Sequence, residues 1–275
     1  TLAPLLGLFG TVIGMIELFG AQDAGGGDPM RIAHGISVAL YNTAFGLIVA
    51  IPALMMWRYL RARVDAYVLA ADLAQPNAVD LLAAEVQNLG LSVDFLINNA
   101  GLSGNYQFTE ASWSELAAEI QIMMTSLTQL CHVFLPAMKA KGWGRVINVS
   151  SIAAYAPPGA SLLYTGIKSY VLNVSQAMDM ELKPHGVNVT ALCPGFTRSE
   201  FHDVMGTRGT TNKFPKLMWQ GADEVAQEAY DAVMAGRPVC VTGWLNKASV
   251  ALMKPLPEGV RYRLGKAMNP FKTGK

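Results

Sequence analysis

The sequence predicts an α/β protein in which a parallel sheet, doubly wound with helices on both faces, is preceded by a two-helix transmembrane hairpin. Apolar, β-branched runs alternate with amphipathic helical patterns from about residue 69 onward, which is typical of parallel strands joined by crossover helices. Hydrophobic residues make up 52% of the 275 residues and charged residues only 15%, with a mean hydropathy of +0.28. This apolar excess is concentrated near the N-terminus. We therefore divide the chain into a hairpin, residues 1–68, and a sheet domain, residues 69–275.

Two apolar runs in the hairpin are long enough to cross a bilayer. They cover residues 2–19 and 35–57, and residues 21–31 between them are a Gly/Asp-rich polar loop. Three arginines follow within residues 58–63, and such an excess of cations marks the cytoplasmic side of a membrane. We expect an inner-membrane protein with its sheet domain in the cytoplasm. A cleaved signal peptide is not expected, because there are two runs and no basic leader.

Charge and cysteine content exclude several classes of function. The chain has 21 Lys and Arg against 20 Asp and Glu, a net charge of +1, so nothing indicates a nucleic-acid partner. Cys131, Cys193 and Cys240 are far apart and form no Cys-x-x-Cys pattern. We expect reduced, buried thiols, with neither a metal site nor a disulfide framework.

The candidate catalytic residues lie between positions 145 and 170. Tyr164 and Lys168 are four residues apart on a predicted helix, so their side chains project from one face. A cation beside a phenol stabilises the phenolate, and we expect it to lower the pKa of Tyr164. Ser151 lies 13 residues before Tyr164, at the C-terminal end of a predicted strand, where open α/β sheets bind ligands. The three side chains suit redox chemistry between a carbonyl and an alcohol.

These residues resemble the short-chain dehydrogenase/reductase family, whose pattern is a serine, about a dozen residues, and then Tyr-x-x-x-Lys. The tetrad Asn98–Gly101 and the pair Pro194–Gly195 also match the family in order and spacing. The resemblance implies a Rossmann-like sheet and a cofactor that is NAD or NADP. It implies that Tyr164 is the general acid/base, that Lys168 modifies its pKa and binds the ribose, and that Ser151 holds the substrate oxygen.

The resemblance extends to the cofactor site. Asp72 matches an acidic position that touches the adenine ring, and residues 196–199 match a segment that meets the nicotinamide carboxamide. The implied cofactor-binding residues are Asp72, Asn98, Ala100, Gly101, Tyr164, Lys168, Pro194, Gly195 and Thr197.

Two departures from the family pattern carry consequences. The family's first strand, glycine-rich phosphate loop and second strand have no counterpart before Asp72, so we expect an incomplete sheet and weak dinucleotide binding. The family commonly has an asparagine in a proton relay at the place of Met123, and Thr125 or Ser126 could serve instead.

Periodicity and turn residues predict the remaining elements. The long helix after the second strand resembles the one found at the family's subunit interface, which implies a homo-oligomer. The tail, residues 244–275, mixes apolar and basic residues, and it would rest on a membrane or cover a subunit. We expect strands at 67–73, 93–97, 187–193 and 238–242, helices at 77–89, 113–138 and 223–234, and an irregular substrate lid at 200–218.

The hairpin has a resemblance of its own. The stretches A-P-L-L-G-L-F-G-T-V-I-G-M and G-I-S-V-A-L-Y-N-T-A-F-G-L-I-V-A-I-P-A-L resemble the last two transmembrane helices of the MotA/TolQ/ExbB proton-channel family. There, threonines matching Thr11 and Thr43 line the pore, whereas an acidic residue common in that family is Val38 here. A dinucleotide loop at G-L-F-G-T-V-I-G is rejected, because this stretch lies inside an apolar span and follows no strand.

Three hypotheses for function follow. The first is an NAD(P)-dependent oxidoreductase acting on a carbonyl or secondary alcohol. The second is a membrane component of a proton-driven energiser with an attached cytoplasmic domain. The third is a fusion of two gene fragments joined near residues 67–71, without either activity.

Overall fold

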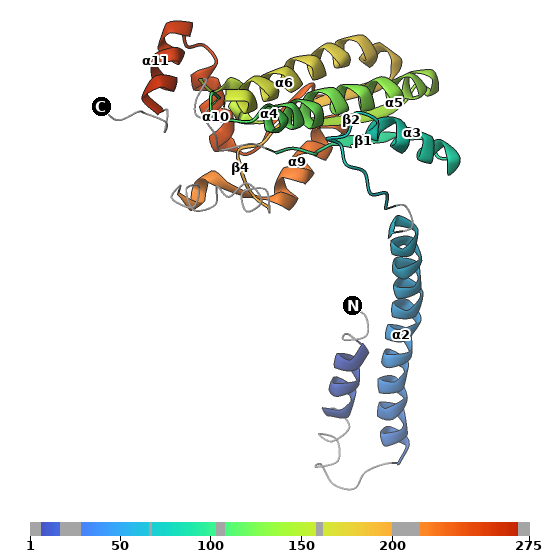
Figure 1. Ribbon diagram of the computed structural model, residues 1–275. Helices are drawn as coiled ribbons and strands as arrows, with labels where there is room; N and C mark the ends of the chain where they lie inside the picture. The colour runs from blue at the N-terminus through green and yellow to red at the C-terminus, as the bar shows by residue number, and fades with distance from the viewer. Residues whose placement is uncertain are drawn as a thin grey trace. The chain divides into compact units, whose positions relative to one another are not determined.

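The computed structural model describes residues 7–16, 29–65, 68–102, 108–157, 162–199 and 215–268. The chain separates into two compact units, Thr1–Ala70 and Ala71–Lys275, and Figure 1 shows the elements of each.

The smaller unit is helical. Residues 7–16 form one helix, and α2 runs for 37 residues from Pro29 to Asp65. The Thr11 hydroxyl donates a hydrogen bond to the Leu8 carbonyl oxygen (2.6 Å). None of the helices described is both long and apolar enough to span a bilayer. The predicted transmembrane hairpin is therefore not confirmed, and residues 2–6 and 17–19 of its first span lie outside the described residues.

The larger unit is built on a parallel sheet, as predicted. Its strands are β1 (Phe95–Asn98), β2 (Gly144–Val149), β3 (Val187–Cys193) and β6 (Val239–Val241), in the order β1-β2-β3-β6. All three pairings are parallel. Within the described residues no strand pairs with the outer edge of β1.

Helices cover both faces of this sheet (Figure 1). On one face, side chains of α3 (Ala78–Asn88), α5 (Leu127–Lys141) and α6 (Leu162–Leu182) pack with Val146, Val187 and Val189. On the other face, α9 (Ala222–Met234) packs with Ile147, Leu192 and Cys240. Both faces of β3 are covered, and its two polar side chains, Asn188 and Thr190, donate hydrogen bonds to the carbonyl oxygens of Val233 (3.0 Å) and Arg237 (2.7 Å).

The predicted helix 113–138 is three consecutive helical segments. These are α4 (Trp113–Ile120), the π-helix η1 (Gln121–Ser126) and α5. A Ser112–Glu115 capping box begins α4. The π-helix adds a residue to the turn, a feature often found at functional sites, and Met123 within it is 1% exposed.

Two glycines fix the start of β2 and β3. Gly142 ends α5 with φ +72°, and Gly186 precedes β3 with φ +77°. A Cβ on Gly186 would run into the carbonyl group of Gly142. The Arg145 guanidinium donates to the carbonyl oxygens of Gly144 (2.7 Å) and Gly186 (3.0 Å). These contacts tie the two strand starts together.

The predicted strand at 67–73 is wrong for residues 68–73. Residues 68–72 have no regular structure, and a turn follows. The Asp72 carboxylate accepts hydrogen bonds from Ala74 N (3.0 Å) and Gln75 Nε2 (3.2 Å). An aspartate that satisfies nearby donors in this way favours a turn over a strand.

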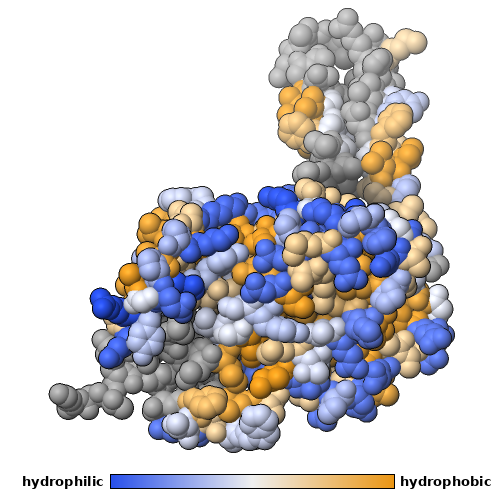
Figure 2. All heavy atoms as spheres, turned by 90° about the horizontal axis from the view of Figure 1, so that it is seen from above, coloured by the Kyte–Doolittle hydropathy of each residue, from blue (hydrophilic) through white to orange (hydrophobic). Residues whose placement is uncertain are grey.

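The remaining elements are short turns, a pair of short strands and two C-terminal helices. Of the predicted lid at 200–218, residues 200–214 lie outside the described residues. Hydrophobic and hydrophilic side chains are intermixed over the larger unit in the view of Figure 2. The elements are the 3₁₀ turns η2 (Ile152–Tyr155), η3 (Lys183–His185) and η4 (Lys216–Met218), the paired strands β4 (Phe196–Arg198) and β5 (Trp219–Gly221), and the helices α10 (Trp244–Met253) and α11 (Glu258–Met268).

Candidate active site

Two adjacent serines at the end of β2 have different tasks. Ser150 is 1% exposed, and its hydroxyl donates to the Lys168 carbonyl oxygen (2.7 Å). Its backbone N–H donates to Leu192 (2.7 Å), and the N–H of Ile152 donates to Pro194 (3.0 Å). Ser151 is half-buried, and its Oγ accepts from Ala153 N (3.1 Å) at the start of η2. Ser150 therefore fixes α6 to the sheet, whereas the Ser151 side chain contacts the start of η2.

Tyr164 and Lys168 lie on the first turns of α6, as predicted. The Lys168 ammonium is 5.5 Å from the centroid of the Tyr164 ring and donates to the Val149 carbonyl oxygen (2.7 Å). The Ser151 hydroxyl also acts on the Tyr164 phenol, whose pKa it lowers against the larger effect of burial. The structure thus brings together the three residues predicted to carry the chemistry.

The direction of the Tyr164 pKa shift differs from the prediction. Burial raises the pKa of the Tyr164 phenol, and the Ser151 hydroxyl only partly opposes this. Burial also lowers the pKa of Lys168 to about 8, while the nearby Cys193 thiol acts in the opposite direction. Desolvation penalises both charged forms, so the expected lowering of the Tyr164 pKa was wrong.

Gly101 lies directly beside Lys168. A Cβ built on Gly101 would be 3.7 Å from Lys168 Nζ and 3.6 Å from Met123 Sδ. The Met123 thioether therefore occupies the space where the resemblance led us to expect a relay asparagine. The Ser126 hydroxyl donates to the Leu73 carbonyl oxygen (2.9 Å), and Thr125 is exposed. Neither hydroxyl shows a contact that would make it the alternative relay.

Asn98 belongs to a buried polar network inside the sheet. Its Nδ2 donates to Asn148 Oδ1 (2.7 Å) and Cys131 Sγ (3.4 Å). Asn148 Nδ2 in turn donates to Ser175 Oγ (2.9 Å). Asn98 and Asn148 are opposite each other in the β1–β2 register. Asn98 therefore joins β1 to β2 and α6, and its neighbours Ala100 and Gly101 are exposed at the strand end.

Three more of the predicted cofactor residues follow the C-terminal end of β3, whereas Asp72 lies at the turn before α3. Pro194, Gly195 and Thr197 are half-buried, and Thr197 Oγ1 donates to the Gly195 carbonyl oxygen (3.3 Å). A Cβ on Gly195 would come within 2.5 Å of the Asn246 amide. The glycine is therefore required by the close approach of Asn246 from α10.

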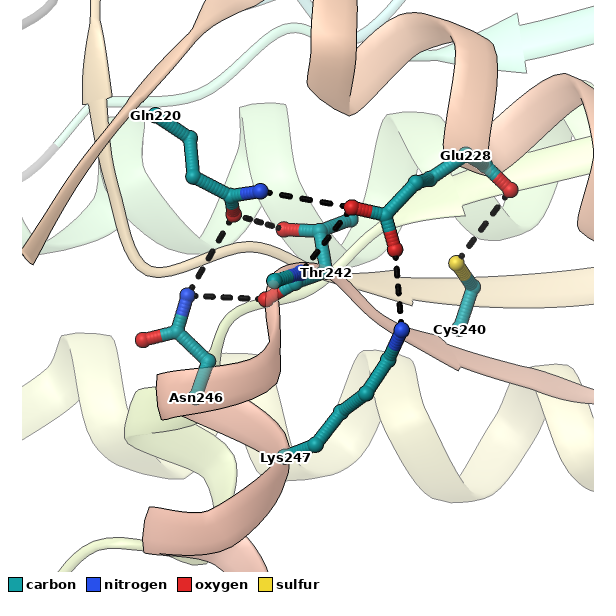
Figure 3. Close-up of polar contacts among 7 residues, drawn as sticks. Gln220, Glu228, Cys240, Thr242, Asn246 and Lys247 are labelled. Carbon is teal, nitrogen blue, oxygen red and sulfur yellow. Dashed lines mark hydrogen bonds and ion pairs between the residues drawn. The ribbon is translucent and has the colours of Figure 1, made fainter.

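Asn246 belongs to a cluster that sequence reasoning missed (Figure 3). Its Nδ2 donates to the Thr242 carbonyl oxygen (2.8 Å) and lies 3.4 Å from Gln220 Oε1, which also accepts from the Thr242 hydroxyl (2.7 Å). Gln220 Nε2 donates to Glu228 (3.3 Å), and Glu228 pairs with Lys247 (3.0 Å). The cluster joins β5, α9, β6 and α10 and supports the backbone at Gly195. No spacing in the sequence reveals it, since its members come from four separate elements.

Comparison with protein families confirms both resemblances. The short chain dehydrogenase family model matches residues 48–208. The MotA/TolQ/ExbB proton channel family model matches residues 1–72.

Individual relatives match the chain at low sequence identity. The chain is 30% identical over 143 residues to nodulation protein G of Azospirillum brasilense, covering 52% of this chain and 57% of that protein. It is 29% identical over 125 residues to the ketoacyl reductase HetN of Nostoc sp., covering 46% and 44%. The chain thus spans about half the length of these relatives.

Solved structures agree with the fold. A short-chain dehydrogenase from Sphingobium yanoikuyae in complex with NADPH has a TM-score of 0.56 at 25% identity, covering 68% of this chain and 75% of that one. A 7beta-hydroxysteroid dehydrogenase has a TM-score of 0.62 at 23% identity, covering 72% and 75%. With its family model matched over more than half of its residues, the chain belongs to the short chain dehydrogenase family.

Proposed function

We propose that the chain is an NAD(P)-dependent oxidoreductase that interconverts a carbonyl compound and a secondary alcohol. The observation that carries this proposal is the contact set of Ser151, Tyr164 and Lys168. Lys168 Nζ lies 5.5 Å from the centroid of the Tyr164 ring, and the Ser151 hydroxyl acts on the Tyr164 phenol, lowering its pKa against the larger effect of burial. A hydroxyl, a phenol and an ammonium at the C-terminal edge of a parallel sheet suit proton transfer to a substrate oxygen.

Each side chain has a distinct part in this chemistry. Ser151 holds the substrate oxygen by a hydrogen bond, and Tyr164 gives that oxygen its proton in reduction or takes it in oxidation. The Lys168 ammonium stabilises the phenolate that Tyr164 then becomes, because opposite charges attract strongly in a desolvated site. Ser150 positions this helix by holding the Lys168 carbonyl. A bound nicotinamide would supply or accept the hydride.

The residues at the strand ends fit the nicotinamide half of the cofactor. Gly101 adds no side chain beside Lys168 Nζ, which a Cβ there would contact at 3.7 Å, and this favours the approach of a ribose hydroxyl to the amine. Ala100 is exposed, and Pro194 and Thr197 are half-buried, so these residues can border a ring. The fit is poorer for the pyrophosphate, since no helix N-terminus preceded by a strand adjoins β1 in the described residues.

Dinucleotide binding is therefore expected to be weak. Titration of NADH or NADPH, followed by calorimetry or by cofactor fluorescence, should give a dissociation constant of ~1 mM. The corresponding binding free energy is about 8 kcal/mol less favourable than that of nanomolar binding. If contacts between the ribose hydroxyls and the Lys168 amine account for the remaining affinity, Lys168→Met should abolish cofactor binding. Micromolar binding by the unaltered chain would contradict the prediction.

The pH dependence of turnover should follow Lys168. Its pKa of about 8 lies below the usual lysine value because the amine is buried. The ammonium is therefore present below pH 8 and is lost as the pH rises through that value, so kcat/KM should fall on the alkaline side. Lys168→Arg keeps its charge at every accessible pH, so any activity it retains should show no such fall. If kcat/KM fell at alkaline pH for both the unaltered protein and Lys168→Arg, the fall would be caused by a group other than Lys168.

A second candidate function is that of a membrane component of a proton-driven energiser. The observation that favours it is the MotA/TolQ/ExbB match over residues 1–72. Thr11 and Thr43 would line the pore. The membrane segments would be residues 2–19 and 35–57 of an inner-membrane protein. Fractionation tests this, because recovery of the chain as a soluble protein would rule out the membrane segments.

The third candidate is a fusion of two gene fragments with neither activity. It is motivated by two unrelated family matches on one chain and by the missing phosphate-binding segment. Sequencing the locus across the codons for residues 67–71 tests it, since an uninterrupted reading frame in independent isolates would exclude an assembly error.

A further inference from the structure

The charge of the chain is unevenly distributed. Residues 244–275 hold seven lysines and arginines against a single glutamate, a net charge of +6, although the whole chain carries only +1. Residues 1–243 accordingly carry a net charge of −5. A block of one sign at one end of a nearly neutral protein indicates a partner of the opposite sign.

The first helix of this segment exposes an apolar stripe. On α10, Trp244 is 70% exposed and Leu252 is 74% exposed, and Ala248 and Ala251 between them are exposed as well. The spacing of these four residues places them on one face of the helix. Asn246 and Val250 on the opposite face are buried. The side of α10 that faces solvent therefore carries an apolar stripe with an indole at one end, bordered by Lys247, which pairs with Glu228.

The second helix adds an aromatic residue and cations. On α11, Tyr262 is 65% exposed, and Arg263 and Lys266 are exposed. The helix is held to the protein by Arg261, whose guanidinium donates to the carbonyl oxygens of Tyr155 (3.2 Å) and Ala156 (3.4 Å). The exposed side chains are thus presented by an anchored helix.

We propose that residues 244–268 form a docking surface for an anionic phospholipid bilayer. Exposed indole and phenol rings beside lysine and arginine are the composition of helices that lie in the headgroup region. Each basic residue near an anionic surface strengthens binding about fivefold. This surface involves neither the residues of the proposed oxidoreductase site nor the predicted membrane spans.

A second copy of the chain is a less suitable occupant of this surface. A two-fold contact brings the same patch of each subunit together. Here it would bring together two sets of the cations Lys254, Arg263 and Lys266, while the segment offers only Glu258 as a counter-charge. Like charges in contact repel, whereas an anionic lipid surface neutralises all of them.

The test uses the full chain carrying Leu252→Cys labelled with an environment-sensitive fluorophore. The native Cys131, Cys193 and Cys240 are buried, and unaltered chain treated with the same reagent measures their background labelling. The labelled chain is compared on nanodiscs of phosphatidylcholine alone and of phosphatidylcholine mixed with phosphatidylglycerol. We expect a blue shift only with the anionic lipid and its loss in ~1 M salt, where the Debye length is about 3 Å.

Two further proteins make the result specific. The variant K254E/R263E/K266E, with the same label, should bind the anionic discs at least ~100-fold more weakly. A label at Met180→Cys, a site on α6 that is 72% exposed, should show no shift. Equal emission from the Leu252→Cys label on both kinds of disc would overturn the proposal. A shift in lipid-free solution that grows with protein concentration would assign the surface to a second copy.

Discussion

Tyr164→Phe should reduce turnover by about 10²- to 10⁴-fold, the usual contribution of a positioned general acid or base. The substitution removes only the phenolic oxygen, on which the Ser151 hydroxyl acts, and keeps the ring beside Lys168 Nζ. The fold and the weak dinucleotide affinity should therefore be retained. The measurement is the initial rate of NADH or NADPH oxidation with a panel of ketones at high cofactor concentration.

Tyr170→Phe is the matched control on the same helix. Its hydroxyl forms a 2.7 Å hydrogen bond with Thr128 Oγ1 and has no part in the proposed chemistry. Tyr170→Phe should cost about 1 kcal/mol of stability and leave turnover unchanged. Equal rates for unaltered protein and Tyr164→Phe would remove Tyr164 from the mechanism.

Gly186→Ala should destabilise the larger unit by more than about 3 kcal/mol. Its backbone has φ +77°, and a Cβ would collide with the carbonyl group of Gly142. The left-handed conformation alone costs about 1–2 kcal/mol for a residue with a side chain. The collision adds to this, because Gly142 is held by the end of α5 and cannot move away. Guanidinium unfolding followed by tryptophan fluorescence measures the loss, since four of the five tryptophans belong to this unit.

Gly90→Ala separates the cost of the left-handed backbone from the cost of the collision. Gly90 also has a positive φ, +65°, but a Cβ there meets no atom within 4 Å. It should therefore lose only the ~1–2 kcal/mol of the left-handed conformation. If both variants lost the same stability, the collision of the added methyl group with the carbonyl group of Gly142 would contribute nothing to the destabilisation.

Much of the sheet could be predicted from the sequence, because its central strands, β2 and β3, are largely buried on both faces. The structure has β3 at Val187–Cys193, the same bounds as the prediction, since an apolar run ends there at a glycine on one side and at Pro194 on the other. The helix carrying Tyr164 and Lys168 was equally recognisable, because four-residue spacing puts both on one face. Short-range patterns of this kind need no knowledge of tertiary structure.

Properties that depend on tertiary contacts could not be predicted. The direction of the Tyr164 pKa shift follows from how deeply the site is buried, which a list of neighbouring charges does not reveal. The strand expected at 67–73 looked plausible locally, but in the described residues it has no sheet neighbour and Asp72 favours a turn. The support of Gly195 by Asn246 joins residues 51 positions apart, so no local pattern signals it.

The position of β1 at the sheet edge has a consequence for hydrogen exchange. β3 lies between β2 and β6, and its amides should exchange only when the whole unit unfolds. β1 is paired on one side within the described residues, and its Ile97 side chain is 57% exposed. Its amides should therefore exchange through local opening, so that strand protection increases from β1 inward to β3.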